Sequence, residues 1–158
     1  MNLTQGAKIV EGFDPQATNG NPASAYVNVS NYHQVYILIH VDKDNAAETS
    51  FALEQATSSA GAGNKALANT VPLWSNLNTG DSDALVRQTN AVSYALDDAA
   101  DGRGQIVVFQ VDPSRLDINN DFNWIRVQVA DGNADNTASC LFVLTDARYK
   151  QATPPSVV

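Results

Sequence analysis

Short runs of strand-forming residues recur along this chain, and no segment keeps an apolar period of 3.6 residues. In the stretch 123–130, Ile125, Val127 and Val129 alternate with larger or polar residues, the period of a strand with one dry face and one wet face. Ten segments carry patterns of this kind, namely 8–11, 26–30, 34–41, 50–57, 70–74, 85–88, 91–96, 105–111, 123–130 and 139–145. The chain is therefore predicted to be built almost entirely of short strands.

Clusters of Gly, Asn, Asp, Pro and Ser separate these runs, as at 19–22, 61–64, 78–81 and 131–133. Such residues favour tight turns, whereas parallel strands need long and usually helical connections. The best helical candidate is a single turn after Asp112, with Asp112 as N-cap and Pro113 in the first position. We therefore predict an all-β fold, an antiparallel β-sandwich, with a jelly roll as its finer form.

The length of 158 residues suits one domain, and 44% hydrophobic residues can fill its core without disulfides or a metal. We expect residues 1–150 to form a single β-sandwich domain with an N-terminal arm. Pro154 and Pro155 prevent the last residues from ending as a central strand or helix, so 151–158 is predicted to be an extended C-terminal tail.

The charged residues are few and mainly acidic: they make up 16% of the chain, against about 25% in average soluble domains, and their net charge is −8. Without a cluster of Lys and Arg, neither phosphate neutralisation nor a polybasic membrane anchor is available. The first eight residues lack the apolar stretch of a signal peptide. We expect synthesis in a cytoplasm and partners that are neither nucleic acid nor membrane.

The residues that carry catalysis are sparse. His33 and His40 stand seven positions apart, which places them on opposite faces of one uninterrupted strand, and neither has a nucleophile motif beside it. Cys140 lies in the apolar run 140–144, as a buried and inert thiol does. We expect no enzyme activity, no catalytic residues and no bound cofactor.

The pattern Asp-x-Asn-x-Asp occurs at 117–121 and again at 131–135, and alternate oxygen ligands are a feature of Ca²⁺ loops. Phe122 and Asn136 replace the glycine of an EF-hand loop, while Gln128 and Phe142 replace its final glutamate. The simpler interpretation is that these Asp and Asn residues form turns between strands. No metal site is predicted.

Trp74 and Trp124 are the two tryptophans. Packing in the core is their commoner role, although a pair of exposed rings could form a stacking platform for sugars on a β-sandwich. Many amide and small side chains with few long charged ones suit a surface that stays in contact with other subunits.

Three segments, 5–15 (QGAKIVEGFDP), 53–67 and 148–155 (RYKQATPP), resemble capsid decoration proteins, also called cement proteins, of tailed bacteriophages. The resemblance implies a virion structural protein on the capsid surface, a β-sandwich that binds the outside of the phage head and cements adjacent subunits of the major capsid protein. It also implies a homo-oligomer, either a dimer or a trimer, with the N-terminal segment and 153–155 as contact arms.

Three alternatives stay open beside this one. A glycan-binding or host-recognition module would share the fold and use Trp74, Trp124 and the Asp loops. A head-tail connector or tail component would occur in fewer copies per particle. A small enzyme is the third.

Overall fold

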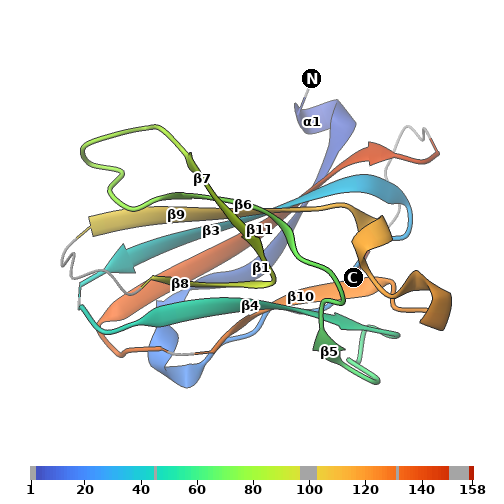
Figure 1. Ribbon diagram of the computed structural model, residues 1–158, viewed down its shortest axis with the longest axis horizontal. Helices are drawn as coiled ribbons and strands as arrows, with labels where there is room; N and C mark the ends of the chain where they lie inside the picture. Colours follow the sequence, from blue (N-terminus) through green and yellow to red (C-terminus); the bar gives the residue numbers. More distant parts are fainter. Residues whose placement is uncertain (1–2, 45, 97–102, 131, 150–156) are drawn as a thin grey trace.

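The computed structural model describes residues 3–44, 46–96, 103–130, 132–149 and 157–158. Two antiparallel sheets pack face to face, and in Figure 1 the strands β4 and β10 lie below β3, β9 and β11. The larger sheet has six strands, in the spatial order β1 (Ala7–Ala17), β11 (Asn136–Ala147), β3 (Tyr32–Lys43), β9 (Arg103–Val111), β6 (Val71–Asn76) and β7 (Val86–Ala91).

The smaller sheet has five strands. Four follow the order β2 (Val27–Asn28), β10 (Trp124–Val129), β4 (Thr49–Ala56) and β5 (Lys65–Ala66), and β8 (Ser93–Leu96) also pairs with β4. Short helical pieces occupy the connections, namely α1 (Leu3–Gly6), η1 (Thr18–Gly20), η2 (Pro113–Arg115) and η3 (Ile118–Asn120). Among the described residues no helix is long and apolar enough to cross a membrane.

The core lies between the sheets, where alternate residues of each strand point inward. Ile37 and Phe109 from the larger sheet and Leu53 from the smaller one have no exposed surface. The other side of each strand faces outward, as the alternating burial along β10 shows. Apolar residues with a period of two therefore produce the two-layer arrangement.

The predicted all-β antiparallel sandwich is confirmed, and each of the ten predicted segments contains a strand. The predicted turn after Asp112 is also present as η2, where the Asp112 carboxylate accepts a hydrogen bond from the Ser114 backbone N–H at 2.8 Å. The jelly-roll connectivity stays a prediction. The strand β5 escaped the sequence analysis because it has only two residues, both exposed.

The structure describes part of each chain end, and the predicted N-terminal arm and extended C-terminal tail stay predictions. Residues 7–17 form β1, which pairs with β11 from Ala7 to Ala17, so within the described part of the chain α1 alone precedes the sheet. The proposed contact segment 153–155 lies outside the described residues. Val157 is buried against the domain itself, and its carbonyl accepts a hydrogen bond from the Asn28 backbone N–H at 2.9 Å.

Candidate functional site: the outer face of the larger sheet

The side of the six-stranded sheet that points away from the core, which we call the outer face, carries a continuous row of in-register side chains. Each member of this central row pairs with the next across neighbouring strands, in the order Glu11, Leu141, Leu38, Val108, Trp74 and Arg87. Four apolar side chains are thus placed side by side, with one acidic end and one basic end. Cross-strand neighbours at this spacing are in contact distance of one another.

Two shorter rows flank the central row on the outer face. The first, the tyrosine row, consists of Ile9, Val143, Tyr36 and Gln110. The second, the histidine row, consists of Ser139, His40, Ile106 and Asn76. Side chains of the same row come from different strands, so the whole patch depends on the register of the sheet.

The three rows combine exposed apolar surface with very little charge. Ile9 is 49% exposed, Leu141 44% and Leu38 37%. Apart from the titratable His40, the charged members are Glu11 and Arg87 alone. Large apolar patches of this kind on a folded domain mark places where another molecule binds.

A shallow hollow of about 330 Å³ lies on the outer face beside the basic end of the central row. Its lining comes from strands β3, β6 and β9 and the segment before β7, and consists of Tyr36, Trp74, Leu85, Val108 and Gln110. Apart from the Gln110 amide, the Tyr36 hydroxyl and the Trp74 indole N–H, these side chains are apolar. The hollow therefore suits an apolar side chain better than a charged ligand.

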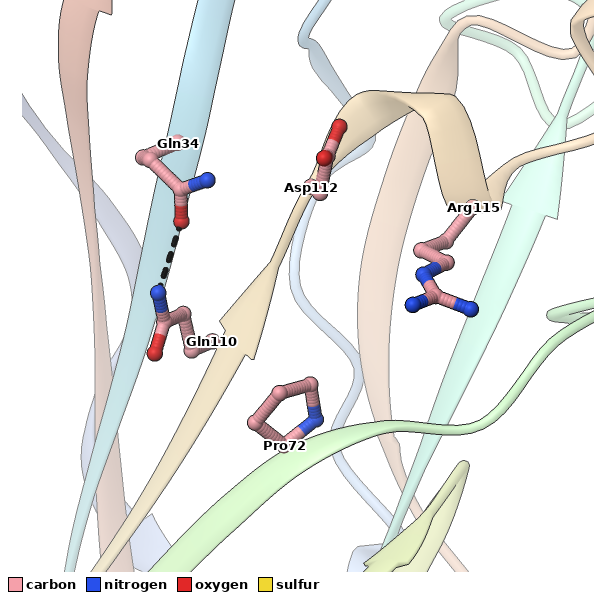
Figure 2. Close-up of a pocket in the computed structure, with 5 residues that line it drawn as sticks. All are labelled: Gln34, Pro72, Gln110, Asp112 and Arg115. Atoms are coloured by element: carbon pink, nitrogen blue, oxygen red, sulfur yellow. Dashed lines mark hydrogen bonds between the residues drawn. The ribbon is translucent and has the colours of Figure 1, made fainter.

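A second hollow of about 200 Å³ continues from Gln110 toward η2 (Figure 2). Gln110 Nε2 donates to Gln34 Oε1 at 2.9 Å, while Asp112 and Arg115 lie at the far side. The hydrogen bond from the Ser114 backbone N–H holds the pKa of Asp112 below its ordinary value. Because this carboxylate is ionised and already caps η2, it is a structural group and not a proton donor.

The two charged ends of the central row have different surroundings. The Glu11 carboxyl lies beside that of Asp14, and the hydrogen bond and like charge between them raise the pKa of Glu11. The Arg87 guanidinium stacks on the Trp74 ring, 4.7 Å from its centroid, and donates to the carbonyl of Leu73 at 3.0 Å. It also donates to the Asn90 side chain.

The two histidines and the cysteine lie in three different environments. His40 lies on the outer face, whereas His33 is exposed near the beginning of β3. Cys140 is buried, and its burial raises the thiol pKa to about 12. A thiol in this state is not a nucleophile near neutral pH.

The Asp117 loop is held by protein groups. The Asp117 carboxylate forms an ion pair of 2.6 Å with Lys65 Nζ and accepts from Asn120 Nδ2 at 2.9 Å. In the second loop Asp131 lies outside the described residues, and Asn133 Oδ1 accepts from the Asp135 backbone N–H at 2.9 Å. Within the described part of the chain, no three His, Cys, Asp or Glu side chains gather as metal ligands would.

The two tryptophans do not form the stacking platform that was the alternative to core packing, because Trp74 lies on β6 in the larger sheet and Trp124 on β10 in the smaller one. The Arg87 guanidinium also occupies one face of the Trp74 ring. Sugar stacking on both rings at once is therefore excluded by the topology.

Sequence reasoning missed a polar cluster on the outer side of the smaller sheet. Arg126 on β10 forms an ion pair with Glu54 on β4, with a distance of 2.7 Å from its terminal nitrogen to Glu54 Oε2. The same guanidinium stacks on Tyr26 at 4.8 Å from the ring centroid. The signal was Arg126 on the wet side of an alternating strand, but its partner on another strand could not be identified without the register.

The outer-face patch was missed for a related reason. Leu38, Val108 and Leu141 each occur within apolar runs, where a single sequence does not tell buried positions from exposed ones. Only the pairing of β11, β3, β9 and β6 brings them into one row.

No family model matches the sequence, and no curated protein matches it. Among solved structures, the SPBc2 prophage-derived protein YomS is similar at 9% identity, over 87% of this chain and 92% of that chain, with a TM-score of 0.47. The K3 cleaved adhesin domain of Lys-gingipain from Porphyromonas gingivalis w83 is similar at 10% identity, over 89% of this chain and 91% of that chain, with a TM-score of 0.35. Both scores lie below 0.5, and neither likeness carries an argument about function.

Proposed function

We propose that this protein is a non-enzymatic virion structural protein that binds the outer surface of a phage head and cements adjacent subunits of the major capsid protein. The proposal rests first on the sequence resemblance to capsid decoration proteins in segments 5–15, 53–67 and 148–155. A cement protein needs broad surfaces for contact with other subunits, and it has no use for a deep substrate pocket.

The observation that carries the proposal is the outer face of the larger sheet. Its central row presents Leu141, Leu38 and Val108 with charge only at the ends. A solitary soluble domain gains nothing from exposing such a row, since apolar surface in water costs free energy and promotes association. A subunit of a permanent assembly covers it.

The test is the composition of purified particles of the phage that encodes the chain. Quantitative mass spectrometry should find this protein in a copy number commensurate with the major capsid protein, and the purified protein should bind expanded heads that lack it. Absence from particles would overturn the proposal. A few copies located at a single vertex would also overturn it and favour a connector or tail component.

A glycan-binding module is the second candidate, and the hollow lined by Tyr36 and Trp74 favours it. Binding of sugars there should saturate and should disappear in a Trp74→Ala variant, while Trp124→Ala on the other sheet should bind normally. Loss of head binding in Trp74→Ala without any sugar binding by the wild type would support the structural proposal instead.

A further inference from the structure

We propose that the outer face of the larger sheet binds the same face of a second copy, so that the protein is a two-fold symmetric dimer with sheets packed face to face. The proposal deepens the proposed function by naming the partner of this face. It rests on the order of side chains in the central row, on their exposed shapes and on the area of the patch.

The order of the central row is self-complementary. The row spans six strands, and its midpoint lies between Leu38 on β3 and Val108 on β9. Consider a two-fold axis that runs parallel to the strands, passes over this midpoint and lies halfway between two copies. Rotation about this axis brings the outer faces of the two copies together and reverses the order of the central row in the second copy. Such an axis produces an isologous interface, in which every contact occurs twice.

The charges match under this operation. Glu11 lies opposite Arg87 of the second copy at both ends of the row. Packed sheets are about 10 Å apart, a gap that a glutamate and an arginine side chain reach across together. A guanidinium from the second copy also offsets the repulsion between the neighbouring carboxyls of Glu11 and Asp14.

The apolar shapes match as well. The same axis places Leu141 opposite Trp74 of the second copy, and Leu38 opposite its Val108. Leu141 is 44% exposed and projects from the sheet, while the hollow of about 330 Å³ lies beside Trp74. An exposed leucine of each copy thus faces the apolar hollow of the other.

The flanking rows bring no conflict. Tyr36 comes opposite Gln110 of the second copy, where hydroxyl and amide can hydrogen-bond, and His40 comes opposite Ile106. No charged group of the three rows meets a group of the same sign. Like charges placed opposite one another would have argued against a symmetric contact.

The area of the patch matches a small, concentration-dependent dimer interface. The central row has six members and each flanking row four, and together these positions cover about 450 Å² per copy at ordinary sheet spacings. Two copies then bury about 900 Å², less than the standard size of about 1,200–2,000 Å² and typical of weaker interfaces. A cement protein has to bind two capsid subunits at once. A dimer can do this because each of its two copies keeps its other surfaces free for one capsid subunit.

The direct test is the mass of the full-length protein in solution, measured by sedimentation and light scattering over a range of concentrations. We expect twice the mass of one chain. Leu141→Asp should shift the protein to monomer, since it buries a charge in the apolar centre of the interface. A wild type that stays monomeric at its highest soluble concentration, or that forms a trimer, overturns the proposal.

Charge reversal provides the sharper test. Glu11→Arg and Arg87→Glu should each raise the dimer dissociation constant about tenfold or more, and the variant that carries both should return toward the wild-type value. Glu48→Arg makes the same change at an exposed position away from the three rows and should leave the dimer intact. If both single charge reversals and Leu141→Asp leave the dimer dissociation constant unchanged, the dimer uses another surface and the proposal fails.

The dimer and the proposed function can fail separately. A monomer that is nevertheless found on phage heads overturns the dimer and leaves the proposed function standing. A dimer with the predicted charge dependence that is absent from particles overturns the proposed function and leaves the dimer standing.

Circular dichroism of each variant confirms that the sheets are still folded.

Discussion

Tyr32 is a large buried side chain whose polar end is unsatisfied. It is 1% exposed, and its hydroxyl has no hydrogen-bond partner among the described residues. Burial without a partner costs free energy, and the same burial raises the pKa of the hydroxyl. The ring therefore stabilises the core, while its oxygen works against folding.

Tyr32→Phe should raise the free energy of unfolding by about 0.5–1 kcal/mol, because it removes the unsatisfied oxygen and keeps the ring. Tyr94→Phe is the matched control: its hydroxyl lies 3.2 Å from Ser75 Oγ, so the same change should lower stability by about 1 kcal/mol. Urea unfolding followed by circular dichroism measures both. A loss of stability in Tyr32→Phe would contradict the prediction.

Gly12 is required by the close approach of β1 to β11. A Cβ at this position would lie 2.8 Å from Cys140 Sγ and 3.0 Å from the Cys140 carbonyl oxygen, at the irregularity between Glu11 and Phe13. Gly12→Ala should therefore cost about 1–3 kcal/mol through overpacking. Gly20→Ala, where no atom lies within 4 Å, should change thermal stability little and serves as the control.

The residue-level expectations from sequence were sound where one residue decides the outcome and failed where two distant ones must meet. The buried state of Cys140 followed from the apolar run around it. The pairing of Asp117 with Lys65, which is 52 positions away, could not follow from the spacing of Asp and Asn residues within the loop.

At the scale of elements, the single turn η2 depends on one cap. The Asp112 carboxylate accepts from the Ser114 backbone N–H, and this bond lowers the pKa of Asp112 from its ordinary value of 3.8. A depressed pKa in the folded state means that the carboxylate stabilises the fold above that ordinary value. The contribution is lost as the pH falls through the lower, folded-state pKa.

Asp112→Ala should lower the free energy of unfolding by about 0.5–1 kcal/mol at neutral pH, whereas Asp112→Asn keeps a capping oxygen and should lose less. The difference between wild type and Asp112→Asn should shrink as the pH falls below 4, because only the aspartate titrates. Urea titrations at neutral and acidic pH measure it. A difference that grows on acidification would refute the role of the ionised cap.

The elements themselves were predictable because their signals are local. Alternation in 123–130 and the turn cluster in 131–133 depend on neighbours in the chain, and β10 (Trp124–Val129) appears where they place it. β5 has no such signal: Lys65 and Ala66 form a strand only because β4 offers an edge to pair with. Pairing between segments, and not propensity, decided its existence.

At the scale of the whole molecule, the spatial order of the strands could not be predicted from the sequence, and the candidate site depends on this order. β11 lies between β1 and β3, although more than a hundred positions separate it from β1 in the chain. A shift of one residue in either pairing would turn Leu141 into the core and remove it from the central row. The outer face is therefore a product of register, which no local pattern encodes.

Cys140 reports on the integrity of this whole arrangement. It lies on β11, flanked by β1 and β3, with its side chain in the core between the sheets. Solvent can reach the thiol only when the larger sheet opens or the two sheets separate. The raised pKa of about 12, against 9.0 for an ordinary thiol, further suppresses the reactive thiolate about a thousandfold near neutral pH.

The folded protein should therefore react with an aromatic disulfide reagent very slowly, and the reaction should become fast once urea unfolds the chain. The measured rate then follows the population of the open state. Gly12→Ala should speed the reaction about tenfold for each 1.4 kcal/mol of stability that it loses, while Tyr32→Phe should slow it. Fast, stoichiometric labelling of the native wild type would mean that the sheets do not enclose Cys140.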